Sequence, residues 1–150
     1  MEKLEVDQTD VKLLRALQSD ARLSYRQVAR RCGVSASTAM TRIRTLEKMG
    51  LIEGYTLRLN YEKLGYDITA ITEVTISKGA IWKEANEISK HPGVCLFYNI
   101  TGQADGIIVA KFKNRSELNE FTKWLLSMDF IQRTNTHICL STLKEDLNIF

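Results

Sequence analysis

Hydrophobic residues recur at helical spacing three times within the first 48 residues. The first helix is predicted over 7–20, with Asp7 or Thr9 as its N-cap. Its apolar face is formed by residues three apart: Val11, Leu14 and Leu17. Together with two shorter helices after it, this segment predicts a compact three-helix unit. About 45 residues make a marginal core, so support from a partner subunit or from the following domain is expected.

The segment 23–50 predicts two short helices joined by a tight turn. Ser24 and Gln27 have the spacing of a capping box, and Gly33 lies where the chain must turn sharply. Ser35 is the expected cap of the following helix. The apolar stripe of the earlier helix comprises Val28, Ala29 and Cys32.

The helix after Ser35 has one buried face, predicted to contain Ala39, Ile43 and Leu46. The opposite side carries only polar residues: Ser37, Thr41, Arg44, Thr45 and Lys48. Thr38 and Arg42 lie on the flanks. Serine and threonine reach base edges or phosphates, and arginine forms a bidentate pair with guanine. The pattern therefore suits a helix that enters a DNA major groove.

From residue 68 onward the pattern changes to strands and helices. Alternating or β-branched runs predict strands over 68–77, 94–101, 106–112 and 131–142. Helical spacing predicts helices over 82–91 and after Asn114, where Glu117 completes a capping box. This order is the ferredoxin-like βαββαβ plan, and the whole chain is expected to be α+β. A short strand is also predicted over 56–60.

Two of the predicted strands are apolar on both sides. In the strand from residue 94, Val94, Leu96 and Tyr98 are expected to face one way, and Cys95 and Phe97 the other. Residues 107–110 are also apolar on both sides. Because helices cover only one face of such a sheet, the other face needs a cover, and a second copy of the sheet is the simplest one.

The net charge of +3 is unevenly distributed. Residues 1–60 contain 11 Lys+Arg and 7 Asp+Glu (+4), whereas residues 61–150 contain 10 and 11 (−1). Six arginines and no acidic residue lie between residues 21 and 46. Such a run is often only a solvated surface, but its coincidence with the helix-turn-helix spacing favours DNA binding.

The remaining composition excludes several classes of protein. The three cysteines are widely spaced, and residues 1–10 lack the apolar region of a signal peptide, so a cytoplasmic protein with reduced thiols is expected. No apolar run is long enough to span a membrane. The two histidines, His91 and His137, fit no catalytic or metal-binding motif, so no enzyme, cofactor or metal is expected.

The stretch from Asp7 to Tyr55 resembles the DNA-binding half of the Lrp/AsnC (leucine-responsive and asparagine-synthetase regulator) family. The resemblance lies in VDQTDVKLLRALQSDAR and YRQVARRCGVSASTAMTRIRTLEKMGLIEGY. It implies a winged-helix-like helix-turn-helix domain (1–54), a linker (55–67) and a ferredoxin-like domain (68–150) for effector binding and assembly. The predicted DNA-binding residues are Arg26, Arg30, Ser35, Ser37, Thr38, Thr41, Arg42, Arg44, Thr45 and Lys48.

The turn at 101–106 contains Gly102, Gln103 and Asp105. On spacing alone it is a plain hairpin turn. The resemblance implies more, because the family has a Gly-x-x-Asp turn here, where an amino-acid effector binds between subunits. Thr134 and Thr136 match a threonine pattern of the same family. These five residues are the predicted effector site.

The resemblance also implies a homodimer paired through its sheets, with further assembly to an octamer. The predicted function is that of a sequence-specific regulator that binds double-stranded DNA and responds to an amino acid. Two alternatives remain. One is an architectural protein that compacts DNA without an effector. The other is an enzyme like the sirohaem decarboxylases, which share the two-domain plan but have no need of a basic recognition helix.

Overall fold

The computed structural model describes residues 6–77 and 82–147. The chain forms two compact units, divided between Arg58 and Leu59. We call them the N-terminal unit (to Arg58, together with the residues from Glu145 on) and the C-terminal unit (Leu59–Lys144). This division falls inside the predicted linker, 55–67, and the domain bounds given above stay predictions.

Three helices form the N-terminal unit: α1 (Gln8–Ser19), α2 (Tyr25–Cys32) and α3 (Ala36–Lys48). Each helix is capped as its sequence predicts, α1 by Asp7, α2 by Ser24 and α3 by Ser35. The three helices share one small core, made of Leu13, Leu17, Val28, Ala29, Ala39 and Ile43. The predicted buried face of α3 is confirmed, including Leu46.

The apolar face of α1 was predicted correctly at Leu17 but not at Val11 and Leu14. Leu13 is completely buried and Leu17 nearly so, whereas Val11 and Leu14 are only half-buried. Because α1 contacts both α2 and α3, its buried stripe is centred between these two neighbours rather than on the i, i+3 series chosen from the sequence.

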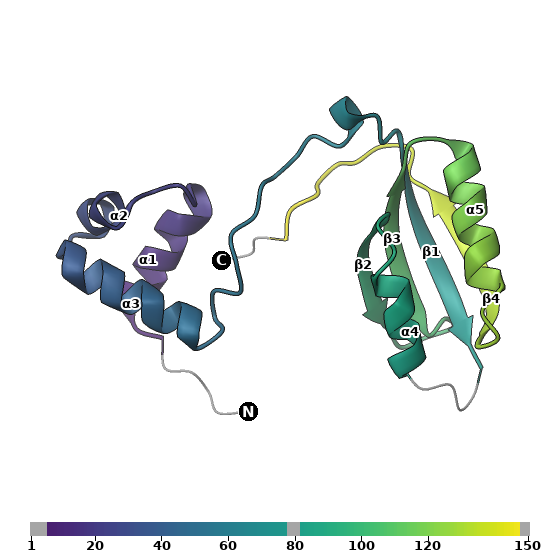
Figure 1. Ribbon diagram of the computed structural model, residues 1–150, viewed down its shortest axis with the longest axis horizontal. Coiled ribbons are helices and arrows are strands. Elements are labelled where there is room, and N and C mark those ends of the chain that lie inside the picture. Colours follow the sequence, from purple (N-terminus) through teal and green to yellow (C-terminus); the bar gives the residue numbers. More distant parts are fainter. Residues whose placement is uncertain (1–5, 78–81, 148–150) are drawn as a thin grey trace. The chain divides into compact units, whose positions relative to one another are not determined.

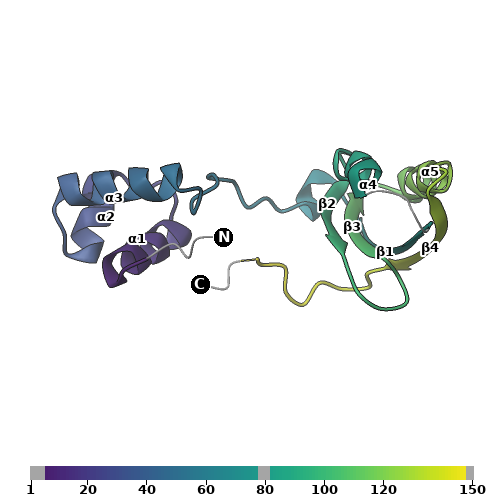
Figure 2. The same cartoon turned by 90° about the horizontal axis from the view of Figure 1, so that it is seen from below.

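The C-terminal unit is a four-stranded antiparallel sheet with two helices on one face, as Figures 1 and 2 show. The strand order is β2-β3-β1-β4, which confirms the ferredoxin-like plan and the α+β class. In chain order the elements are β1 (Ile68–Ile76), α4 (Trp82–Ser89), β2 (Val94–Asn99), β3 (Gly106–Phe112), α5 (Arg115–Leu126) and β4 (Ile131–Ile138). Several of the predicted elements extended two to four residues too far.

The core of the C-terminal unit lies between the sheet and its helices. Val74 and Ile108 of the central strands are completely buried, as are Ile88 of α4 and Leu125 of α5. The other sheet face carries partly exposed apolar side chains. By register with the core residues, they are Ile71, Leu96, Tyr98, Ile107 and Val109.

The predicted alternation along β2 was wrong at its first residue. Val94 pairs with Ala110 and Leu96 with Val109, so a β-bulge at Cys95 shifts the register. Val94 therefore packs against the core on the same side as Phe97, and not beside Leu96. An extra residue in one strand reverses the side on which the later side chains lie, which the sequence alternation does not reveal.

Residues 56–60 join no sheet within the described residues, and Leu57 is 77% exposed. The family resemblance implies that the strand predicted here pairs with a partner subunit, so this strand stays a prediction. A single 3₁₀ turn, Glu62–Leu64, follows before β1 begins. Within the described ranges no helix is long and apolar enough to cross a membrane.

Gly106 opens β3 at a crowded position, and its substitution tests the packing of the sheet. A Cβ there would lie 2.8 Å from Phe97 Cε2 and 3.0 Å from Val74 Cγ2. We expect Gly106→Ala to lower the free energy of unfolding by about 1–3 kcal/mol in urea titrations. Gly54→Ala is the control, since nothing lies within 4 Å of its Cβ position, and it should change stability by less than about 0.5 kcal/mol. Equal effects would contradict the packing described.

Candidate nucleic-acid interface and effector turn

Local side-chain contacts set the geometry of the α2–α3 pair. Ser24 and Gln27 form a reciprocal capping box, because Ser24 Oγ accepts from Gln27 N and Gln27 Oε1 accepts from Ser24 N. Gly33 ends α2 with φ +70°, a left-handed conformation that favours glycine. Ser35 Oγ then accepts from Thr38 N at 3.0 Å and starts α3.

Most of the predicted DNA-binding side chains lie on the surface. Thr38 and Arg42 are half-buried, and the other eight are exposed: Arg26, Arg30, Ser35, Ser37, Thr41, Arg44, Thr45 and Lys48. Those of α3 occupy the side opposite to Ala39 and Ile43. The exposed residues of α3 form what we call the polar ridge, which is available to a partner: Ser37, Thr41, Arg44, Thr45 and Lys48. The apolar side of the same helix is buried in the core.

Hydroxyl groups cluster at the N-terminus of α3. Ser35 Oγ lies 2.9 Å from Ser37 Oγ and 2.8 Å from Thr38 Oγ1. Further along the helix, Thr45 Oγ1 donates to the carbonyl oxygen of Thr41 at 3.0 Å. Thr41 itself is exposed, and the part of the chain that the structure describes gives its hydroxyl no hydrogen bond. The start of a helix attracts phosphate through its free N–H groups, and these hydroxyls extend that capacity.

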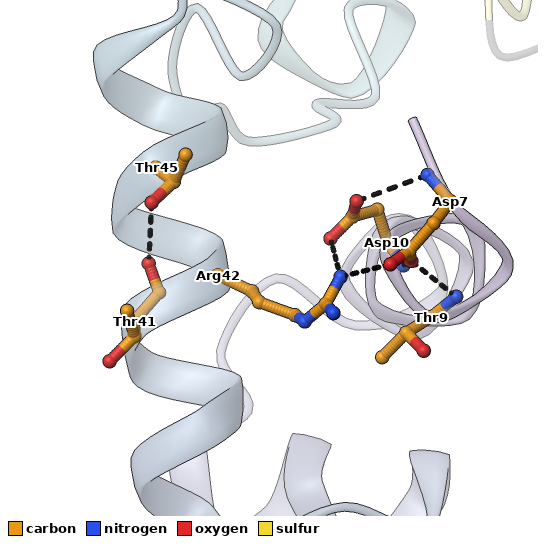
Figure 3. A network of polar contacts seen from close by, with 6 residues as sticks. All are labelled: Asp7, Thr9, Asp10, Thr41, Arg42 and Thr45. Carbon is orange, nitrogen blue, oxygen red and sulfur yellow. Dashed lines mark hydrogen bonds and ion pairs between the residues drawn. The ribbon is translucent and has the colours of Figure 1, made fainter. Parts of the chain in front are cut away.

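Arg42 has a partner within the fold, as Figure 3 shows. Its guanidinium donates to Asp7 Oδ2 and, at 3.1 Å, to Asp10 Oδ1. Both carboxylates belong to the start of α1, where Asp7 and Asp10 form a capping box of their own. Arg42 therefore ties the middle of α3 to the N-terminus of α1, a role that helical spacing alone does not indicate. We call this set of three residues the Arg42 clamp.

The clamp shifts the pKa values of Asp7 and Arg42. The backbone N–H of Asp10 and the Arg42 side chain lower the pKa of Asp7 below its usual 3.8. Hydrogen bonds to Asp7 and then Asp10 raise the pKa of Arg42 above its usual value. Asp7 and Arg42 are therefore both charged at neutral pH.

A second contact that the sequence did not suggest lies beyond α3. Tyr55 Oη donates to Glu47 Oε1 at 2.9 Å, and burial together with that carboxylate raises the pKa of Tyr55 to about 12. The contact holds the chain that leaves α3 against the last turn of the helix. The spacing of eight residues crosses a turn, so no helical or strand periodicity predicts it.

The turn between β2 and β3 is closed by Asp105. Its Oδ2 accepts from Ile76 N at 2.7 Å, and its own N–H donates to the carbonyl oxygen of Val74 at 2.9 Å. Gly102 has φ +130°, and both it and Gln103 are exposed. One oxygen of Asp105 thus has a structural role, and within the described residues the other, Oδ1, makes no hydrogen bond.

The structure brings the two threonines close to this end of the sheet. Thr134 of β4 pairs with Val74, the residue that also accepts from Asp105 N. Thr136 lies two pairs further along, and its Oγ1 is 3.1 Å from Thr72 Oγ1. The turn and Thr134 therefore flank the same residue of β1 from its two sides.

Comparison with known families assigns both parts of the chain. Residues 6–53 match the winged helix-turn-helix DNA-binding family, and residues 69–149 match the Lrp/AsnC ligand binding domain. An HTH-type transcriptional regulator of Pyrococcus furiosus is 42% identical over 146 residues, covering 97% of this chain and 99% of the relative. The regulator FL11 of Pyrococcus horikoshii is 32% identical over 95% of each chain.

Solved structures agree with the fold. A transcriptional regulator of Neisseria meningitidis in complex with L-methionine superposes with a TM-score of 0.88 at 27% identity, covering 95% of both chains. LrpC of Bacillus subtilis gives a TM-score of 0.84 at 26% identity, covering 95% of this chain and all of the other.

The Arg42 clamp predicts a pH-dependent contribution to stability. Since the pKa of Asp7 is lower in the folded state, the clamp stabilises fully above about pH 3.8, and this effect is lost as the pH falls through the lower folded value. Arg42→Ala should therefore lower the melting temperature of the N-terminal unit at pH 7 and have less effect at pH 3, as measured by circular dichroism.

Arg44→Ala is the matched control for this measurement. Arg44 is exposed, and the described residues include no hydrogen-bond or ion-pair partner for it, so its removal should leave the melting temperature unchanged at both pH values. An Arg42→Ala variant that melts like Arg44→Ala at pH 7 would contradict the clamp.

Proposed function

This chain belongs to the Lrp/AsnC family of DNA-binding transcription regulators. On that premise we propose that it recognises specific double-stranded DNA as a dimer or larger assembly. An amino acid is proposed to modulate this DNA binding. The polar ridge of α3 is the observation that carries the proposal. It is exposed, capped at its start by hydroxyls, and free of acidic residues until Glu47.

Different residues of the helix-turn-helix are proposed for different tasks. Thr41 and Arg44 lie on the exposed ridge of α3 and are proposed to contact base edges. Arg26 and Arg30 are exposed on α2 and are proposed to contact phosphates. Arg42 is proposed to act indirectly by orienting α3, because its guanidinium is engaged by Asp7 and Asp10.

The apolar sheet face supports a dimer. Leu96, Ile107 and Val109 are only half-buried there, and Tyr98 is 50% exposed. A second copy of the same sheet would cover these side chains through a two-fold interface. Two recognition helices related by that axis would meet half-sites on a near-palindrome about 34 Å or more apart. Assembly beyond the dimer, to an octamer, is proposed from the family resemblance.

The turn at 101–105 is proposed as the effector site, with Thr134 and Thr136 beside it. Asp105 Oδ1 is available for an ammonium group, while the exposed turn around Gly102 and Gln103 offers backbone amides to a carboxylate. The structure of the Neisseria meningitidis regulator contains L-methionine, which supports an amino acid as the ligand class.

Substitutions on the ridge should reduce the preference for specific DNA. In fluorescence-anisotropy titrations with the protein's own upstream DNA and a scrambled duplex, Arg44→Ala or Thr41→Ala should weaken specific binding about 10- to 100-fold more than random binding. Arg26→Ala or Arg30→Ala should weaken both alike and reduce the salt slope by about one each.

Two outcomes of this titration would count against the proposal. Equal losses from all four substitutions would refute the division between base and phosphate contacts. Equal and steeply salt-dependent binding of the unsubstituted protein to both duplexes, with no response to amino acids, would favour an architectural protein instead.

Asp105→Asn separates the two roles of Asp105. The amide oxygen still accepts from Ile76 N, but the negative charge that would bind an ammonium group is gone. With each of the twenty amino acids titrated by calorimetry, we expect the tightest ligand to bind Asp105→Asn at least about ten-fold more weakly. The melting temperature and DNA affinity should stay the same. Unchanged amino-acid affinity would remove Asp105 from the site.

A further inference from the structure

A cavity of about 420 Å³ lies within the C-terminal unit, away from the turn that holds Asp105. It is formed where the chain leaves α4, where β3 ends, and along one side of α5. Its walls are aromatic: His91, Phe112, Phe121 and Trp124. Cavities of this size and lining are typical of small-molecule sites in proteins.

The aromatic walls are held in place by several contacts. The ring centroid of His91 lies 4.9 Å from that of Phe121 and 5.0 Å from that of Trp124. Phe112 and Phe121 are 5.1 Å apart, and both are buried. Offset and tilted ring pairs at these distances are favourable, and a further ring from a ligand can pack in the same way against His91 and Trp124, which are only half-buried.

His91 itself is fixed by the backbone. Its Nδ1 accepts from Gly93 N at 3.1 Å, so in the neutral ring the proton is on Nε2. A Cβ at Gly93 would lie 3.1 Å from the carbonyl oxygen of Lys111, which shows how closely this loop approaches β3. Burial also lowers the pKa of His91, which keeps the ring uncharged at neutral pH.

The rim of the cavity carries charges of both signs. Lys113 supplies a cation, and Glu117 and Glu120 supply anions. Lys111 contributes its backbone, because its Nζ is buried and donates to Thr69 Oγ1 at 3.2 Å. Lys113 Nζ lies 5.5 Å from the centroid of the Tyr66 ring. Glu117 Oε2 accepts from Lys113 N at 2.8 Å, and so helps to hold the β3–α5 corner. A rim that presents both a cation and a carboxylate favours a ligand that carries both charges.

We propose that this cavity, which we call the α5 pocket, binds a zwitterionic amino acid with an aromatic side chain, at a site separate from the proposed effector turn. The side chain would pack against the half-buried rings of His91 and Trp124. The carboxylate would lie near Lys113 and the ammonium group near Glu120. The α5 pocket shares no residue with the turn at 101–105, and it is complete within one copy of the chain.

Trp124 is a built-in reporter for this proposal. The chain has two tryptophans, so Trp82→Phe leaves Trp124 as the only one. L-phenylalanine is a suitable probe because it does not absorb where tryptophan is excited. We expect it to change Trp124 emission in a saturable way. Phenylpropionate and phenethylamine, which each lack one of the charges, should bind at least ten-fold more weakly.

Variants in the same background locate the ligand. Lys113→Gln and Glu120→Gln should each raise the dissociation constant at least ten-fold. Lys123→Gln is the matched control, since it removes an exposed charge of α5 outside the pocket and should change nothing. These positions are at the surface, so the variants are expected to fold, which circular dichroism checks.

The outcomes distinguish ligand binding in the α5 pocket from ligand binding at the turn at 101–105. No saturable change up to 10 mM L-phenylalanine, a figure on the order of weak small-ligand affinities, would overturn the pocket. So would equal affinity in Lys113→Gln, Glu120→Gln and Lys123→Gln, or loss of the signal in Asp105→Asn. Loss in the two rim variants with Asp105→Asn unaffected would establish it, whether or not the turn binds its own ligand.

Discussion

The small core of the N-terminal unit is the constraint on which DNA recognition depends. Three short helices bury Leu13, Val28, Ala39 and few other side chains completely or nearly so, and a core of this size is marginal. The orientation of α3 therefore also depends on polar contacts to other elements. Arg42, in the middle of α3, supplies one such contact to the start of α1. The apolar side of α3 is buried in the core, and its polar side therefore faces outward.

Features decided by residues close in sequence were predictable. The capping serines, the left-handed glycine after α2 and the buried stripe of α3 each depend on residues at most seven positions apart, and the structure shows all of them. The order of strands and helices in the C-terminal unit follows from periodicity in the same way, and its sheet topology is the standard one for that order. This covers most of the fold.

Features that depend on distant pairings were not predictable. The Arg42 clamp joins residues 32 and 35 positions apart, and Asp105 meets Ile76 across 29 positions. The bulge at Cys95 depends on how β2 fits β3. The strand predicted over 56–60 needs a partner subunit, and among the described residues it joins no sheet. Periodicity describes one element at a time, so contacts between elements lie beyond it.

Periodicity also does not reveal which side chains of the candidate sites are paired within the fold, and the structure shows this for two of them. Arg42 and Arg44 are the same residue type two positions apart in one helix, and both were predicted to bind DNA, yet one is engaged by two carboxylates and the other is exposed. Asp105 holds the turn with one oxygen and leaves the other available. A side chain whose polar atoms are already paired gains little from a ligand, because binding must first break those contacts. Recognition is therefore best assigned to the groups that the fold leaves exposed, and orientation to those that it pairs.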